Sequence, residues 1–181
     1  MRLGSSADRD PVLSALNDVI RAPRVNGVIR DALERVLQKL GASSETMAWE
    51  IIPFEMIDTE LPENIRSCWV FAIRAGAETG AERHPNSHQR SCSLVGSGRF
   101  ELRAGGGWRS HPLRSADDGS SMEQRWVSIP PSTWHRLFVG SEAWAMVSFH
   151  TVPPEELIEE RPMDANDLDG ETHQARYAER R

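Results

Sequence analysis

The first part of the chain has the hydrophobic spacing of helices. Between Asn26 and Gly41, apolar residues occupy positions 29, 33, 36, 37 and 40, and these steps of three and four place them on one helical face. Gly41 stands where a C-terminal cap is expected. A shorter helix is predicted from Pro11 to Ile20, with the proline in its first turn. Neither helix can bury its apolar stripe alone, so both are expected to pack on another part of the chain.

The pattern changes after residue 45. Short β-prone segments alternate with clusters of glycine, proline and serine, which are typical of strands joined by turns. The predicted strands lie within 47–54, 67–74, 90–95, 99–103, 126–129, 135–139 and 143–151. Short strands at this spacing, without alternating helices, predict an all-β sandwich or barrel.

These patterns divide the chain into three parts. Residues 1–45 form a predicted helical arm, and residues 46–152 form the β-structure. Residues 153–181 are rich in charge and are predicted to be a tail that is solvated, loosely docked or disordered.

Composition and charge narrow the class of protein. The 181 residues are 39% hydrophobic and 27% charged, which suits one domain with its own core. Lys and Arg number 21 against 27 Asp and Glu, a net charge of −6, so nucleic acid is not an expected partner. No apolar run reaches the roughly 18–20 residues that span a bilayer, and the first residues lack the apolar segment of a secretory signal. With two cysteines and no disulfide framework, we expect a reduced, cytoplasmic protein without membrane contact.

The candidate chemistry is concentrated in a polar stretch between two predicted strands. This stretch contains Glu82, His84, His88 and Gln89. Imidazole and carboxylate groups are the usual protein ligands of zinc, iron, manganese, nickel and copper. His135 follows a rigid proline turn and begins the next predicted strand, so it is a reasonable further ligand. The spacing matches neither a zinc finger nor an HExxH helix, and histidines of an exposed loop would give the same pattern.

Two longer motifs contain these residues. The first is Gly76-x5-Glu82-x-His84-x4-Gln89-x6-Gly96, and the second is Pro130-x-Ser132-x2-His135. They resemble the two motifs of the cupin superfamily, G-x5-H-x-H-x3,4-E-x6-G and G-x5-P-x-G-x2-H-x3-N. The resemblance covers about residues 47–152 and implies a double-stranded β-helix, the cupin jelly roll, preceded by the N-terminal α-helices. It also implies one divalent metal ion, held by the first motif and by the histidine of the second.

The chain departs from the family pattern at several positions. Glu82 stands where the family has its first histidine, whereas His84 and His135 are retained. The family glutamate falls on Gln89 if four residues intervene after His84, or on His88 if three intervene. The second motif lacks its opening glycine, its turn glycine and its closing asparagine, which are replaced by Gln124, Ser132 and Val139.

Strand geometry bears on the choice between His88 and Gln89. Successive side chains of a strand alternate between its faces, so the two cannot both point inward. Because histidine binds transition metals better than a neutral amide does, we predict His84, His88 and His135 as the metal ligands. Glu82 is an additional candidate ligand. Gln89 is a candidate for a hydrogen bond that orients one of the metal-binding histidines.

Three neighbouring residues have both a functional and a structural interpretation. Arg90 could bind a carboxylate or phosphate of a ligand, or form an ion pair. Trp134 could form the wall of a pocket, or pack in the core. His150 ends a predicted strand and is interpreted as an edge histidine rather than a residue of the barrel interior.

Together these residues predict a metal-binding cupin that takes a small-molecule ligand. Iron is the first expectation for the ion, with zinc, manganese or nickel as alternatives, and dioxygenase chemistry is the first expectation for the reaction. The departures at Glu82 and Gln89 favour the alternative, a non-catalytic binding or sensor protein. A homodimer that pairs through a sheet edge is also expected.

Overall fold

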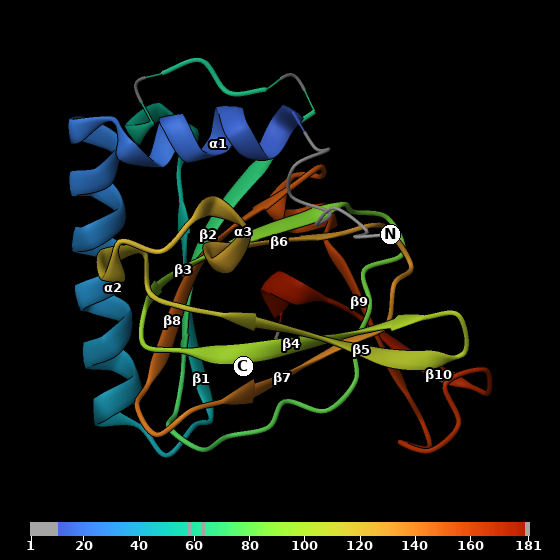
Figure 1. Cartoon of the computed structure of the whole chain (residues 1–181). Helices are drawn as coiled ribbons and strands as arrows, with labels where there is room; N and C mark the ends of the chain where they lie inside the picture. Colours follow the sequence, from blue (N-terminus) through green and yellow to red (C-terminus); the bar gives the residue numbers. More distant parts are fainter. Residues whose placement is uncertain (1–10, 58, 63, 180–181) are drawn as a thin grey trace, which may run out of the picture.

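The computed structural model describes residues 11–57, 59–62 and 64–179 and is built mainly of antiparallel strands (Figure 1). A five-stranded sheet has the order β1-β2-β8-β3-β6, a three-stranded sheet has the order β5-β4-β7, and β9 pairs with β10. The strands are β1 (Met47–Ile52), β2 (Ser67–Ile73), β3 (Gln89–Val95), β4 (Gly98–Ala104), β5 (Gly107–Leu113), β6 (Trp126–Ile129), β7 (His135–Val139), β8 (Trp144–His150), β9 (Ile158–Pro162) and β10 (Thr172–Arg176). The predicted all-β jelly roll with N-terminal helices is confirmed.

The central strands β2 and β8 are buried along their whole length because each face meets a different core. One face of β2, with Cys68 and Val70, packs with the helices. The other face, with Phe71 and Ile73, packs with residues of the three-stranded sheet such as Phe100. The second core lies between the two sheets, and the functional site lies in the same space.

The two N-terminal helices cover the outer face of the five-stranded sheet, as the spacing of their apolar residues predicts (Figure 1). They are α1 (Pro11–Arg21) and α2 (Pro23–Ala42). The predicted cap role of Gly41 is wrong, because α2 continues past it to Ala42. The cap is Ser43, whose N–H donates to the Leu40 carbonyl oxygen at 3.4 Å. Within the described part of the chain, no helix is both long and apolar enough to cross a membrane.

The remaining helical segments are single turns in the connections. They are α3 (Met122–Arg125), η2 (Phe54–Met56), η3 (Ala116–Asp118), η4 (Pro154–Glu156) and η5 (Tyr177–Glu179).

The described part of the C-terminal segment is not the loose tail that its charge predicted. Its strands β9 and β10 form a hairpin, and Glu160 of β9 forms an antiparallel bridge with Arg83. Glu160 is buried because its carboxylate also pairs with the Arg83 guanidinium at 2.5 Å. The Tyr177 N–H also donates to the carbonyl oxygen of the buried Leu157, and this hydrogen bond holds the segment further in place. Part of the charge in this segment is therefore used in ion pairs within the fold.

Candidate metal centre

Backbone pairing brings the two predicted motifs together. Glu82 and His135 form an isolated antiparallel bridge in which each N–H donates to the other's carbonyl oxygen at 2.8 Å. Next to this bridge, the Ser132 N–H donates to the His84 carbonyl oxygen at 3.0 Å. Because side chains alternate along an extended chain, Glu82 and His84 point to the same side, where His135 meets them.

The three side chains form a compact buried cluster. Each of Glu82, His84 and His135 offers one ligand atom, and these atoms all lie within 4.8 Å of one another. Glu82 Oε1 lies 3.6 Å from His135 Nε2, and the two imidazole centroids are 5.4 Å apart. Among the described residues, this is the only group of three or more such side chains close enough to share an ion.

The strand order and the pairing of the two motifs inside the β-structure determine the architecture. This chain has the cupin fold. The motif resemblance therefore identified the architecture correctly, although the chain departs from the cupin pattern at several positions.

Comparison with known proteins finds likeness in structure only. No family model matches the chain, and no curated protein matches its sequence. Oxalate oxidase in complex with glycolate is 14% identical with a TM-score of 0.47, and the match covers 61% of this chain and 53% of that chain. The Lactobacillus farciminis oxalate decarboxylase formate complex is 16% identical with a TM-score of 0.46, covering 61% and 30%. The Schizosaccharomyces pombe Cnp3 cupin domain is 14% identical with a TM-score of 0.44, covering 60% and 62%.

Backbone carbonyls fix the orientation of both imidazoles in the cupin site. His135 Nδ1 lies 3.0 Å from the Thr133 carbonyl oxygen, and His84 Nδ1 lies 2.9 Å from that of Ile158. A carbonyl only accepts hydrogen bonds, so each Nδ1 carries the proton and each Nε2 keeps its lone pair. The same arrangement orients histidine ligands of metal ions in other proteins.

His135 Nε2 is the least satisfied polar atom of the cluster. His135 is 0% exposed, and its Nε2 has no hydrogen-bond partner among the described residues. Buried polar atoms are paired in most proteins, so a buried lone pair facing a carboxylate indicates a missing ligand, water or ion. The cluster therefore fits a divalent cation by its donor types and by this atom.

Burial and neighbouring charges set the protonation states that metal binding requires. Burial raises the pKa of Glu82, but the neighbouring His135 and the charge of Arg161 outweigh it and bring that pKa to about 2. Burial, together with the neighbouring His135, lowers the pKa of His84 to about 4. At neutral pH, the site therefore presents a carboxylate and a neutral imidazole.

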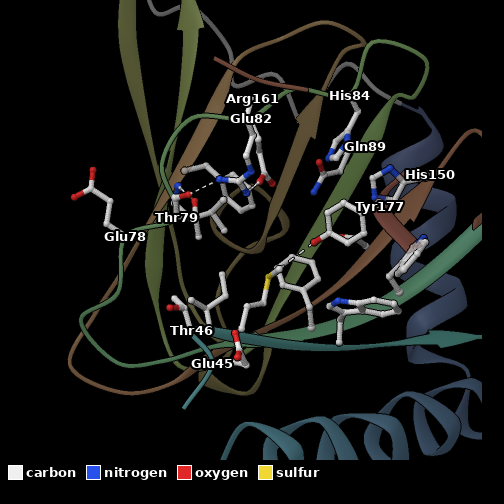
Figure 2. A pocket seen from close by; sticks show the side chains of 18 residues that line it. Glu45, Thr46, Glu78, Thr79, Glu82, His84, Gln89, His150, Arg161 and Tyr177 are labelled. Atoms are coloured by element: carbon white, nitrogen blue, oxygen red, sulfur yellow. Dashed lines mark hydrogen bonds and ion pairs between the residues drawn. The ribbon is translucent and has the colours of Figure 1, made fainter. Parts of the chain in front are cut away.

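Arg161 of β9 holds the Glu82 carboxylate in place (Figure 2). One guanidinium nitrogen, Nη2, contacts Glu82 Oε2, while Nη1 donates to the Thr79 carbonyl oxygen at 2.9 Å and Nε donates to Glu159 at 2.6 Å. The contact leaves Oε1 of Glu82 directed at His135. Sequence reasoning missed Arg161 because it lies in the segment interpreted as a tail.

The structure does not bring His88 to the cluster, which corrects its predicted role as a leading ligand. Its Nε2 lies 2.8 Å from Ser128 Oγ, outside the cavity. The physical reason is strand parity: Cys92 and Leu94 pack on the helix side of β3, and His88 precedes them at even spacing. The same parity turns Gln89 inward, where it lines the cavity.

Arg90 and Trp134 also lie away from the cavity. Arg90 is buried on the helix side of β3, where its Nη2 lies 3.4 Å from His88 Nδ1. Trp134 donates from Nε1 to the Leu168 carbonyl oxygen at 3.0 Å, and the Arg83 guanidinium lies 4.5 Å from its ring centroid. Neither residue lines the cavity, so their predicted ligand-binding roles are corrected to structural ones.

A cavity of about 350 Å³ opens beside the cluster (Figure 2). Glu82 and His84 line it, and a wall of mostly aromatic side chains faces them. The larger members of this wall are Met47, Trp49, Trp69, Phe71, Phe100 and Tyr177. The volume is that of a site for a small organic molecule.

Two further residues of the cavity were misplaced or missed by sequence reasoning. His150 is buried, lines the cavity and lies 5.3 Å from His84 between ring centroids, so its interpretation as an edge histidine is wrong. The inward direction of His150 follows from strand alternation, because Trp144 and Met146, at even spacing before it on β8, face the interior core. Tyr177 packs on Trp69 with 5.4 Å between the ring centroids. It lies far from Trp69 along the chain, and neither motif contains it.

Proposed function

We propose that this cupin binds one divalent metal ion through Glu82, His84 and His135 and acts with it on a small organic molecule in the adjacent cavity. The observation that carries the proposal is the buried Nε2 of His135, which faces a carboxylate and has no hydrogen-bond partner among the described residues. Three protein ligands leave coordination positions for a substrate.

Two histidines and one carboxylate with open positions are the ligand set of non-haem iron oxygenases, so iron is the first candidate and dioxygenase chemistry the first reaction. Zinc, manganese and nickel accept the same donors. When bound, the ion would supply Lewis acidity or one-electron redox chemistry.

The residues of the chain prepare the site for that chemistry. The Thr133 and Ile158 carbonyls keep the two Nε2 lone pairs directed into the cluster. Arg161 holds the Glu82 carboxylate in place. The aromatic wall gives the cavity beside the cluster an apolar surface for the body of a small molecule.

Metal analysis tests the proposal directly. Protein incubated with Fe(II), Mn(II), Ni(II) or Zn(II) and then desalted is expected to retain about one equivalent of one ion, measured by mass spectrometry of the elements. His135→Ala and Glu82→Ala should lose it, with circular dichroism confirming that the variants fold. His88→Ala is the matched control and should retain the ion. Wild-type protein without metal, or loss of metal in His88→Ala, would contradict the proposed ligand set.

The second candidate function is a non-catalytic small-molecule-binding cupin. Gln89 favours it, because a neutral amide stands where the family motif has a carboxylate ligand. Oxygen uptake with candidate substrates by the metal-loaded protein separates the two, since a binding protein consumes none. A homodimer and a cytoplasmic location remain predictions.

A further inference from the structure

Gln89 presents an unused hydrogen-bond acceptor to the cavity. The side chain lines the cavity, is only 5% exposed, and its Oε1 has no hydrogen-bond partner among the described residues. Figure 2 shows Gln89 beside His84 among the side chains that line the cavity. A buried acceptor of this kind is satisfied when a ligand brings a donor to it.

The orientation of this amide is set by a chain of hydroxyl groups. Gln89 Nε2 donates to Ser91 Oγ at 3.0 Å, and Ser91 Oγ lies 2.5 Å from Ser148 Oγ on the neighbouring strand β8. Ser91 is fully buried and Ser148 nearly so. The amide nitrogen is therefore occupied within the protein, and the carbonyl oxygen is the group left for a ligand.

The charges around the cavity disfavour an anionic ligand. Arg161 is the only arginine or lysine among the residues that line it. Two carboxylates, those of Glu82 and Glu159, already pair with its guanidinium, and its Nη1 donates to a backbone carbonyl. Exposed Glu45 and Glu78 add negative charge at the cavity lining. Among the described residues that line the cavity, no arginine or lysine is therefore left to pair with a carboxylate or phosphate.

The opposite wall suits an apolar body. Trp49 and Trp69 pack edge to face with centroids 5.3 Å apart, and Tyr177 contacts both rings. Phe71 completes this wall from the next inward position of β2. Aromatic rings bury large areas and favour aromatic partners.

We propose that the cavity takes an aromatic or otherwise apolar molecule carrying a hydroxyl or amino group that donates to Gln89 Oε1, and that its side chains alone, without a bound metal ion, discriminate against carboxylates. The inference rests on the proposed function in that this cavity is the substrate site beside the metal. It adds the substrate class and makes Gln89 the residue that determines specificity.

Three probes of similar size test the inference on protein freed of metal by a chelator: 2-phenylethanol, its methyl ether and phenylacetate. Ligand-observed NMR titration is expected to show 2-phenylethanol binding about fivefold more tightly than the ether, the effect of one neutral hydrogen bond. Phenylacetate is expected to bind at least about tenfold more weakly than the alcohol, because its carboxylate meets no free cation of the protein.

Substitution of Gln89 isolates its contribution. In Gln89→Leu, the difference between alcohol and ether should vanish, while the exposed-surface control Gln38→Leu keeps it. Gln89→Glu is the second variant, used if the leucine variant fails to fold. Its carboxylate can accept a hydrogen bond from Ser91. A carboxylate at this position should also increase the preference of the cavity for 2-phenylethylamine over 2-phenylethanol.

The outcomes separate this inference from the proposed function. It is overturned if 2-phenylethanol does not bind wild-type protein, if phenylacetate binds as tightly as the alcohol, or if Gln89→Leu keeps the alcohol preference. If Gln89→Leu does not fold, an unchanged amine preference in Gln89→Glu overturns it equally. Metal content measured on separate, metal-loaded samples of the same proteins reports independently on the proposed metal site.

Discussion

Ser132 occupies the turn position where the second cupin motif has glycine, and its backbone takes φ = 62°. It is the only non-glycine residue with positive φ in the described part of the chain. This left-handed conformation is costly for residues with a Cβ atom. The turn keeps it because the Ser132 N–H donates to the His84 carbonyl oxygen, which holds the second motif against the first.

Ser132→Gly should therefore stabilise the protein. Removing the Cβ relieves the left-handed strain, and part of that gain is offset by the greater freedom of glycine in the unfolded chain, so we expect about 0.5–1 kcal/mol. Thermal unfolding should show a midpoint a few degrees higher. Ser132→Ala retains the strain and serves as the control with no gain. A lower midpoint for the glycine variant would contradict this account.

Gly96 and Gly105 are a matched pair for testing whether the backbone at a glycine packs too closely on its neighbours to admit a Cβ atom. Both have positive φ, of 74° and 60°. A Cβ at Gly96 would lie 2.3 Å from the Ala143 carbonyl oxygen, whereas one at Gly105 would meet nothing within 4 Å. Gly96→Ala should cost at least about 2 kcal/mol more than Gly105→Ala in chemical denaturation, because only the first adds a backbone clash to the strain. Equal losses would show that the clash is relieved by a small shift.

At the level of elements, the C-terminal hairpin completes a site that the barrel strands begin. Ile158 is the first residue of β9, and its carbonyl oxygen orients His84. Further along the same strand, Glu160 pairs with Arg83. Asn86, in the loop after His84, fastens this strand through two hydrogen bonds: its amide donates to the Glu156 carbonyl oxygen at 2.7 Å and accepts from the Ile158 N–H at 3.2 Å. The hairpin therefore supports the cluster of Glu82, His84 and His135 directly.

Asn86→Ala should loosen the hairpin and weaken metal binding together. Loss of two hydrogen bonds, each worth about 1 kcal/mol, should increase amide hydrogen exchange in residues 156–162 and raise the metal dissociation constant several-fold. Asn166→Ala, in the exposed turn between β9 and β10, is the control and should change neither. Weaker metal binding without faster exchange in 156–162 would mean that Asn86 acts by another route.

For the whole molecule, metal binding and folding should be coupled. The ligands come from segments around residues 82–84 and 135 that converge only in the folded state, so an ion bound there stabilises that state. At a free metal concentration about 100 times the dissociation constant, the gain is about 2.7 kcal/mol.

Removal of metal by a chelator should then lower the unfolding midpoint of wild-type protein by about 5–10 °C, given about 2–4 °C per kcal/mol for a chain of this size. His135→Ala should show no chelator effect, and His88→Ala should show the full shift in differential scanning calorimetry. A chelator shift that persists in His135→Ala would place the ion elsewhere.

The sequence by itself determined the class of fold and most of the cluster. Apolar spacing of three and four predicted the helices, and short β-prone segments between turns predicted an all-β sandwich or barrel, because local periodicity records which face of an element is buried. The resemblance to the two cupin motifs then implied the jelly roll. The two motifs singled out Glu82, His84 and His135 as candidates, since their ligand chemistry is visible in the residue types.

Tertiary structure decided which side chains share the cavity. The inward turn of Gln89 instead of His88 depended on the phase of β3, which packing against the helices sets and a polar loop does not reveal. Arg161 and Tyr177 join the site through a hairpin whose charges resemble a solvated tail until their partners are known. Such contacts span about 80 residues or more of chain, and local patterns carry no record of partners that far apart.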